Sequence, residues 1–138
     1  KDGLTVSHIT KELIKRKKVT DWLVHLGGNP LDSIQDLMKI STIAKEIGFK
    51  QFLYSGYTYS EFLNMFDSNT HSVLLNNINY IKTGRFDMNY SKKNCFDVGT
   101  EYFFETLNQE VYESKNQAWE KFYSFDFNNK NIYGSFLI

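Results

Sequence analysis

The sequence predicts an α/β fold built around a parallel sheet. Short apolar runs rich in β-favouring residues predict three strands, at residues 22–26, 51–55 and 77–82. Helical spacing of apolar residues predicts helices between them, at residues 31–47 and 58–66. Strand, helix, strand, helix, strand in this order requires right-handed crossovers, and these give a parallel sheet.

A further helix is expected before the first strand. Thr5 or Ser7 can cap it, because a side-chain oxygen at this position accepts a hydrogen bond from a free helix N–H. Its apolar positions recur at helical spacing: Val6, Ile9, Leu13 and Ile14. It ends in the basic run 15–18, which we interpret as the solvated end of a helix, a nucleic-acid patch being the alternative.

The longest predicted helix and its successor carry their own boundary signals. Pro30 suits the first turn of the helix at residues 31–47, and Gly48 stands where a terminating glycine belongs. Thr58 or Ser60 can cap the next helix, and Glu61 offers Thr58 a capping-box partner.

Each predicted strand ends in a turn that contains glycine. These turns are Gly27-Gly28-Asn29, Ser55-Gly56-Tyr57 and Thr83-Gly84-Arg85. In parallel sheets ligands bind at the carboxyl ends of the strands, so the three turns should share one ligand-binding edge. A Gly-Gly pair lets a ligand approach the backbone closely, although such a turn alone is often only a connection.

Beyond residue 86 the pattern is less regular. Residues 87–99 are polar and predict a long loop, and residues 101–104 and 110–112 predict short strands. Ser114 can cap a short helix around Ala118. Residues 122–138 predict a closing β-hairpin. We therefore expect a single domain over residues 1–138, with a β/α core at 1–86 and a tail at 87–138 that completes the sheet.

Composition and charge exclude several classes of protein. Of 138 residues 41% are hydrophobic, which is ample for one buried core, and 16 basic residues balance 16 acidic ones. Without a basic field we expect no nucleic-acid partner and no membrane partner. Neither a signal peptide nor an apolar run of membrane-spanning length occurs in these residues, which predicts a cytoplasmic protein.

The histidines and the single cysteine do not form a recognisable catalytic or metal-binding motif. We expect His25 to be a core histidine in a buried strand, a ligand role being the alternative, and His8 and His71 to lie on the surface. Cys95 alone cannot form an internal disulfide or a cysteine metal site. No catalytic residue and no metal ligand is assigned.

Four motifs in a fixed order resemble a known family. They are Leu-Gly-Gly-Asn-Pro-Leu at 26–31, Phe-Leu-Tyr-Ser-Gly-Tyr-Thr at 52–58, Ile-Asn-Tyr-Ile-Lys-Thr-Gly-Arg-Phe at 78–86 and Leu-Asn-Gln at 107–109. Together they resemble the activating protein of anaerobic ribonucleoside-triphosphate reductase, a radical S-adenosylmethionine enzyme. The resemblance covers residues 5–112.

The resemblance implies both a fold and a function. The fold is a partial β/α barrel of the radical S-adenosylmethionine type, here followed by the C-terminal β-hairpin. The function is that of an activating enzyme that generates a glycyl radical on the large subunit of anaerobic ribonucleotide reductase, its partner. The cofactors are S-adenosylmethionine and a 4Fe-4S cluster.

The family's functional positions can be transferred where the motifs match. The implied cofactor-binding residues are Gly27, Gly28, Asn29, Pro30, Ser55, Gly56, Tyr57, Arg85 and Asn108. By resemblance, the first four hold the amino group of S-adenosylmethionine. For Arg85, a surface salt bridge is the alternative to a contact with a carboxylate or phosphate.

The sequence departs from the family in two ways. Asn29 stands where the family has an acid, which removes a charge that would pair with an amine. The family's Cys-x3-Cys-x2-Cys loop has no counterpart, so a cluster requires an upstream cysteine loop. Two hypotheses follow: an activating enzyme, inactive without its N-terminal cluster segment, or a cluster-free binding or scaffold module derived from that fold.

Overall fold

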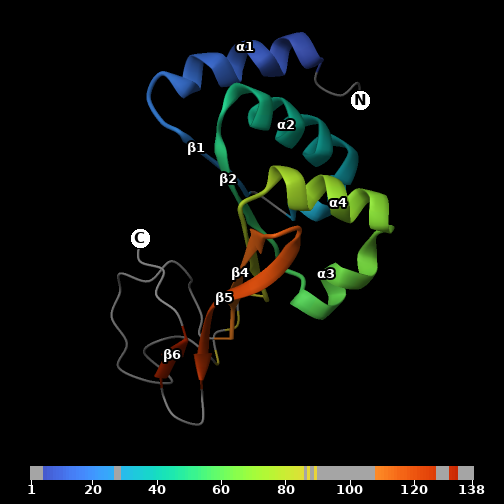
Figure 1. Cartoon of the computed structure of the whole chain (residues 1–138), viewed down its shortest axis with the longest axis vertical. Helices are drawn as coiled ribbons and strands as arrows, with labels where there is room; N and C mark the ends of the chain where they lie inside the picture. The colour runs from blue at the N-terminus through green and yellow to red at the C-terminus, as the bar shows by residue number, and fades with distance from the viewer. Residues whose placement is uncertain are drawn as a thin grey trace.

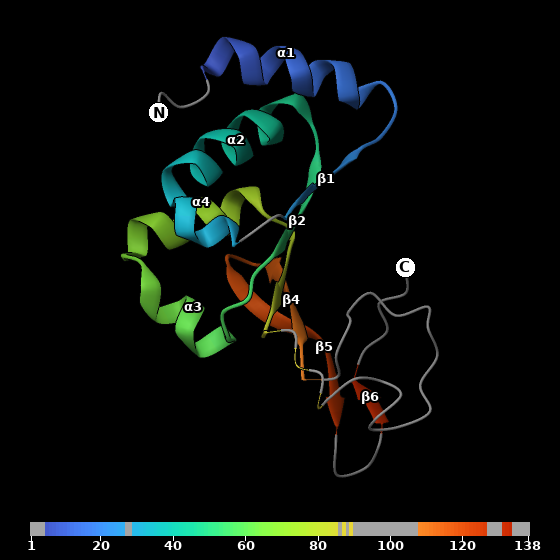
Figure 2. The same cartoon turned by 180° about the vertical axis from the view of Figure 1, so that it is seen from behind.

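The computed structural model describes residues 5–26, 29–85, 87, 89, 108–126 and 131–133. Its strands are β1 (Trp22–His25), β2 (Lys50–Tyr54), β3 (Tyr80–Thr83), β4 (Glu110–Lys115), β5 (Ala118–Asp126) and β6 (Asn131–Tyr133). Its helices are α1 (Val6–Lys17), the 3-10 helix η1 (Pro30–Ser33), α2 (Ile34–Ile47), α3 (Tyr59–Met65) and α4 (Ser68–Asn77). Figures 1 and 2 show these helices gathered on one side of the strands.

The sheet has the strand order β1-β2-β3-β4-β5-β6. The first three strands are parallel, as predicted, and the others are antiparallel, with β6 paired to the end of β5. The expected C-terminal hairpin is therefore present as the pair β5-β6. Among the described strands the sheet is open, and the barrel implied by the resemblance stays a prediction.

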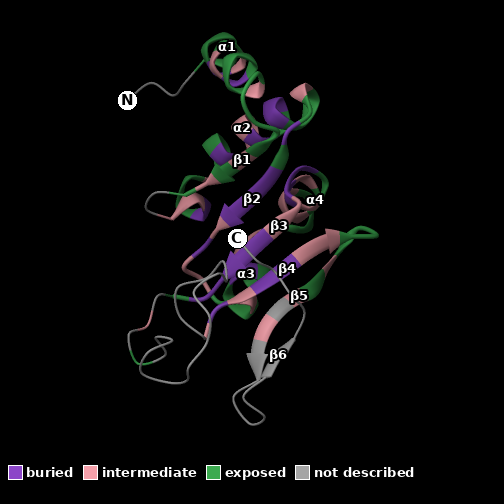
Figure 3. Ribbon diagram, turned by 90° about the vertical axis from the view of Figure 1, so that its left-hand side faces the viewer, coloured by how far each residue is buried: buried purple, intermediate pink, exposed green. Residues whose placement is uncertain are grey.

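Strand β1, which contains His25, was expected to be buried, and this expectation is wrong. In the described part of the chain β1 pairs only with β2, and exposed and half-buried residues alternate along it. Trp22 and Val24 remain 41% and 40% exposed. A four-residue apolar run has the same composition in a central strand and at an edge, so the sequence could not distinguish them. Figure 3 shows the buried residues concentrated in β2, β3 and β4 instead.

The core lies between the helices and one face of the sheet. One cluster joins α1 and α2 to the start of β2; its buried members are Ile9, Leu13, Ile43, Ala44 and Phe49. A larger cluster joins η1, α2, α3 and α4 to the strands; it consists of Leu31, Leu37, Leu53, Phe62, Leu74, Ile78, Ile81 and Tyr112. This burial of apolar area fixes the helices on the sheet and so determines where the strand ends lie.

The predicted boundary signals of α1 and α2 are present. The Thr5 hydroxyl accepts a hydrogen bond from the His8 N–H at 3.1 Å. Gly48 ends α2 with φ of 112°, a left-handed conformation that glycine adopts without steric cost. The basic end of α1 is exposed, and Lys17 pairs with Asp21 at 2.8 Å, in agreement with a solvated helix end. No helix in the described residues combines the length and apolar character needed to cross a membrane.

The capping box at the start of α3 gives a testable prediction. The Thr58 hydroxyl accepts from the Glu61 N–H at 3.2 Å, and the Glu61 carboxylate accepts from the Thr58 N–H at 2.9 Å. We expect Thr58→Ala to lower the free energy of unfolding by about 1 kcal/mol, the usual contribution of such a cap. Urea unfolding measures this loss. Ser60→Ala, two residues further on, is the control and should change the free energy of unfolding little. Equal losses in the two variants would contradict the assignment of the cap.

Helix α4 was not predicted, and the third strand was placed too early. Asn77, expected to begin the strand, is the last residue of α4, and β3 begins at Tyr80. The Asp67 carboxylate caps α4 by accepting from the Thr70 N–H at 2.8 Å. The helix has only a weak apolar stripe, since Leu74 is its one fully buried apolar residue, so periodicity gave no clear signal.

The segment after β4 also differs from expectation. Residues around Ala118 form the start of β5 rather than a helix capped by Ser114. Asn116 and Gln117 have φ of 53° and 62°, which is the backbone of a two-residue hairpin turn. The usual signal for this turn is Asn-Gly, and Asn-Gln does not carry it. The strand expected at 101–104, Cys95 and most of the loop expected at 87–99 lie outside the described residues.

His71 is not a surface residue, contrary to expectation. Both of its ring nitrogens are buried without a hydrogen-bond partner, and its ring packs edge-on against Phe62 at 5.0 Å between centroids. His8 is exposed, as expected.

Candidate functional site

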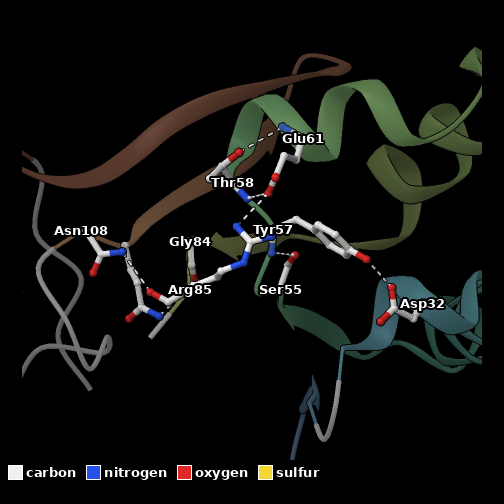
Figure 4. A network of polar contacts seen from close by, with 9 residues as sticks. Asp32, Ser55, Tyr57, Thr58, Glu61, Gly84, Arg85 and Asn108 are labelled. Atoms are coloured by element: carbon white, nitrogen blue, oxygen red, sulfur yellow. Dashed lines mark hydrogen bonds and ion pairs between the residues drawn. The ribbon is translucent and has the colours of Figure 1, made fainter. Parts of the chain in front are cut away.

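The carboxyl ends of β1, β2 and β3 meet at one edge of the sheet (Figure 4). The Gly84 N–H donates to the Tyr57 carbonyl oxygen at 2.7 Å, which joins the turns after β3 and β2. A Cβ placed on Gly56 would lie 3.6 Å from the Asn29 side-chain nitrogen, so the segment after β1 reaches the same place. Gly27 and Gly28 lie outside the described residues.

The first side of this edge is formed by the start of η1. The Asn29 carboxamide oxygen accepts from the Leu31 N–H at 3.3 Å, and Pro30 occupies the first helical position. Asp32 follows on the same turn, and its carboxylate accepts a hydrogen bond from the Tyr57 hydroxyl at 2.5 Å. This hydrogen bond raises the pKa of Tyr57, because it stabilises the protonated hydroxyl.

The turn after β2 presents Tyr57 between the other two strand ends. The buried Ser55 hydroxyl accepts from the Tyr57 N–H at 3.0 Å and fixes the turn. The Arg85 guanidinium lies 6.0 Å from the centre of the Tyr57 ring and contacts the Glu61 carboxylate at 3.1 Å. The Thr58 N–H, with Arg85 as a second cause, lowers the pKa of Glu61.

The segment before β4 closes the third side. The Asn108 carboxamide donates to the Arg85 carbonyl oxygen at 2.9 Å, and the Gln109 carboxamide donates to the Gly84 carbonyl oxygen at 3.2 Å. Gly84 has φ of 100° and packs closely on the backbone of Gln109. Arg85 therefore forms the surface salt bridge foreseen as an alternative, yet its side chain stays 60% exposed and keeps further N–H donors at the edge.

Two pockets of about 480 Å³ each open on this edge. The β1 pocket lies between β1 and α2; its lining is Val24, His25, Leu26, Asn29, Pro30, Asp32, Ser33, Asp36, Leu37 and Ile40. The β3 pocket is lined by Thr58, Tyr59, Thr83, Gly84, Arg85, Asp87, Asn108 and Glu110. The hydrogen bond between Tyr57 and Asp32 lies between the two pockets, because Asp32 lines the first and Tyr57 adjoins the second.

Sequence reasoning placed Asn29, Pro30, Ser55, Gly56, Tyr57, Arg85 and Asn108 in the candidate site, and the structure brings these residues to one edge. Their role in binding stays a prediction. Asp32 and Glu61 were missed as residues of this edge. The position of Asp32 in the first turn after Asn29 and Pro30 was a usable signal, whereas the reach of Arg85 to Glu61 depends on tertiary packing.

His25 is half-buried and belongs to a polar chain behind the edge. Its Nε2 lies 2.7 Å from the Gln51 carboxamide oxygen, and the Gln51 carboxamide nitrogen donates to the Ser41 carbonyl oxygen at 2.9 Å. Burial lowers the pKa of His25, and the hydrogen bond to Gln51 opposes this only in part. His25 is therefore a hydrogen-bonded histidine, as expected, although in an edge strand.

The fold is an open α/β sheet with polar turns gathered at the carboxyl ends of its parallel strands. It therefore belongs to the class of α/β proteins in which ligands bind at this edge of the sheet. Within this class, a family model described as a 4Fe-4S single cluster domain matches residues 3–117, and the chain belongs to that family. No curated protein and no solved structure matches the chain significantly. The family is compatible with a radical S-adenosylmethionine role.

The residues of this chain do not fit the cluster that the family implies. A 4Fe-4S cluster is held by about three or four cysteine thiolates, and the 138 residues contain only Cys95. The described residues also contain no group of three histidine, cysteine or carboxylate side chains that could hold a metal ion. No chemistry of a cluster can be derived from these side chains.

Proposed function

We propose that the carboxyl edge of β1, β2 and β3 binds S-adenosylmethionine as part of a radical S-adenosylmethionine-type protein with a partial β/α barrel. The observation that carries this proposal is the meeting of three strand ends around two pockets in a chain of the 4Fe-4S single cluster family. S-adenosylmethionine is long and carries a sulfonium cation, an amino acid and an adenosine. A site with two adjoining pockets suits such a ligand.

The charges at the edge support a cationic ligand with one carboxylate. Asp32, Glu61 and Glu110 lie at or beside the two pockets and favour the sulfonium and the ammonium. Arg85 is the basic residue of the β3 pocket, and its planar guanidinium is suited to the ligand carboxylate. In this proposal the chain binds and orients the ligand, and cysteines outside these 138 residues hold the cluster.

The particular reaction and partner rest on the sequence resemblance alone. We propose that the whole protein activates anaerobic ribonucleotide reductase in the cytoplasm by generating a glycyl radical on its large subunit. The second candidate is a cluster-free binding or scaffold module. The single cysteine and the neutral Asn29 favour this second candidate.

Equilibrium dialysis with S-adenosylmethionine tests the proposed site. We expect saturable binding by the intact wild-type protein. We expect its loss in Gly28→Val, because the resemblance implies that the ligand approaches the backbone at this glycine, and a side chain would block such an approach. The urea midpoint of the variant should stay near that of the wild type. If the folded wild-type protein shows no saturable binding of S-adenosylmethionine, the proposed site is refuted.

Iron analysis of the full-length protein, purified without oxygen, separates the two candidates. The enzyme requires about four iron atoms per chain together with S-adenosylmethionine binding. Binding without iron, in a full-length protein that lacks further cysteines, identifies the cluster-free module.

A further inference from the structure

The polar chain behind the edge fixes the tautomer of His25. A carbonyl oxygen only accepts hydrogen bonds, so the group of Gln51 that faces the Ser41 carbonyl must be its NH2. The oxygen of the same carboxamide therefore faces His25, and Nε2 must carry the proton at their 2.7 Å contact. Gln51 is fully buried, which leaves this carboxamide no other orientation with both partners satisfied.

The opposite nitrogen of the ring is left as an acceptor. With the proton on Nε2, Nδ1 of neutral His25 holds a lone pair, and it has no partner in the described part of the chain. Nδ1 is not fully buried, and His25 lines the β1 pocket. The lowered pKa of His25 keeps the ring neutral near pH 7.

The rest of the β1 pocket selects for a hydrogen-bond donor of positive charge. Among its lining residues the acidic side chains are those of Asp32 and Asp36, and none is a lysine or an arginine. Asp32 uses one oxygen for Tyr57 and keeps the other. The remaining lining contains apolar Val24, Leu26, Leu37 and Ile40, against which a carbon chain can pack.

We propose that the β1 pocket binds an organic ammonium group, which donates a hydrogen bond to Nδ1 of His25. The ammonium we assign is the amino group of S-adenosylmethionine, and this assignment rests on the proposed function. His25 would then supply, together with the charge of Asp32 and Asp36, the acceptor that the neutral Asn29 does not provide. His25 is a binding and positioning residue in this proposal.

Nitrogen NMR of the ¹⁵N-histidine-labelled full chain tests the proposal without a variant. We expect the Nδ1 resonance of His25 to show an unprotonated nitrogen and to shift towards the hydrogen-bonded form on addition of S-adenosylmethionine. Methylthioadenosine, which has the adenosine but no amino acid, should leave it unchanged. An Nδ1–H in the free protein, or equal shifts with both ligands, overturns the proposal.

Methionine methyl ester separates this proposal from the proposed function. The ester has the ammonium and the thioether chain, without the carboxylate or the adenosine. If S-adenosylmethionine does not bind but the ester shifts Nδ1, the ammonium pocket stands and the proposed function fails. If S-adenosylmethionine binds without any shift of Nδ1, the proposed function stands and the role of His25 fails.

A variant gives the size of the effect. We expect His25→Phe to weaken binding of S-adenosylmethionine by roughly tenfold to a hundredfold, the range for one hydrogen bond to a charged group, and to leave methylthioadenosine binding unchanged. His8→Phe, on the exposed side of α1, is the control and should bind both ligands normally. Equal loss of both ligands by His25→Phe would indicate damage to the fold, and the NMR result on the wild type then decides.

Discussion

Gly84→Val should lower the free energy of unfolding by about 2–6 kcal/mol, the sum of backbone strain and of overpacking, each of about 1–3 kcal/mol. Gly84 has φ of 100°, where a β-branched residue is strongly disfavoured. A Cβ at this position would lie 3.3 Å from the Gln109 Cα and 3.4 Å from the Asn108 carbonyl oxygen. Both are backbone atoms, so neither can move aside without shifting the chain.

The same substitution should also remove the ligand site. The turn at Gly84 donates to Tyr57 and accepts from Gln109, so a shift there displaces Arg85 from its contacts with Glu61 and Asn108. We expect S-adenosylmethionine binding to be lost even at temperatures where the variant is folded. Urea unfolding measures the loss of stability. Equilibrium dialysis at about 10 °C below the thermal unfolding midpoint of the variant measures the loss of binding.

Gly56→Ala is the matched control for this prediction. Gly56 lies on the same edge, but its backbone has no left-handed φ, and its added Cβ would meet only the Asn29 side-chain nitrogen at an ordinary 3.6 Å. We expect a stability change within about 1 kcal/mol of zero. Similar urea midpoints for the valine variant and this control would show that the turn at Gly84 does not require glycine.

Those parts of the fold that depend on local chemistry could be predicted from the sequence. The caps of α1 and α3 and the end of α2 follow from Thr5, Thr58 and Gly48, each of which acts on its own neighbours in the chain. The parallel order of β1, β2 and β3 follows from the alternation of strands and helices. The meeting of their ends at one edge is a consequence of that order.

The parts that depend on tertiary partners could not be predicted. The edge position of β1 is set by which strands pair, and its apolar residues are compatible with either position. The hairpin at Asn116 and Gln117 adopts positive φ without glycine because the pairing of β4 and β5 holds it. At the site, Asp32 is distant in sequence from Tyr57, and Glu61 is distant from Arg85, so these two contacts exist only once the sheet has formed.

Gln51→Leu should lower the free energy of unfolding by about 3 kcal/mol, because two buried groups lose their partners at about 1–3 kcal/mol each. The Gln51 carboxamide is the partner of both the Ser41 carbonyl oxygen and the His25 Nε2–H, and its side chain is fully buried between β2 and α2. Leucine has nearly the same volume, so the loss comes from the unpaired polar groups and not from a cavity.

Gln35→Leu is the control, because Gln35 lies exposed on α2. This substitution is the same chemical change as Gln51→Leu, made at the surface. We expect its unfolding free energy to change by less than about 0.5 kcal/mol. Urea unfolding of both variants at pH 7 measures the difference. If the two variants unfold at the same urea concentration, Gln51 is not the link between His25 and Ser41. The tautomer of His25 would then no longer be fixed by the fold, because only the Gln51 oxygen requires the proton to be on Nε2.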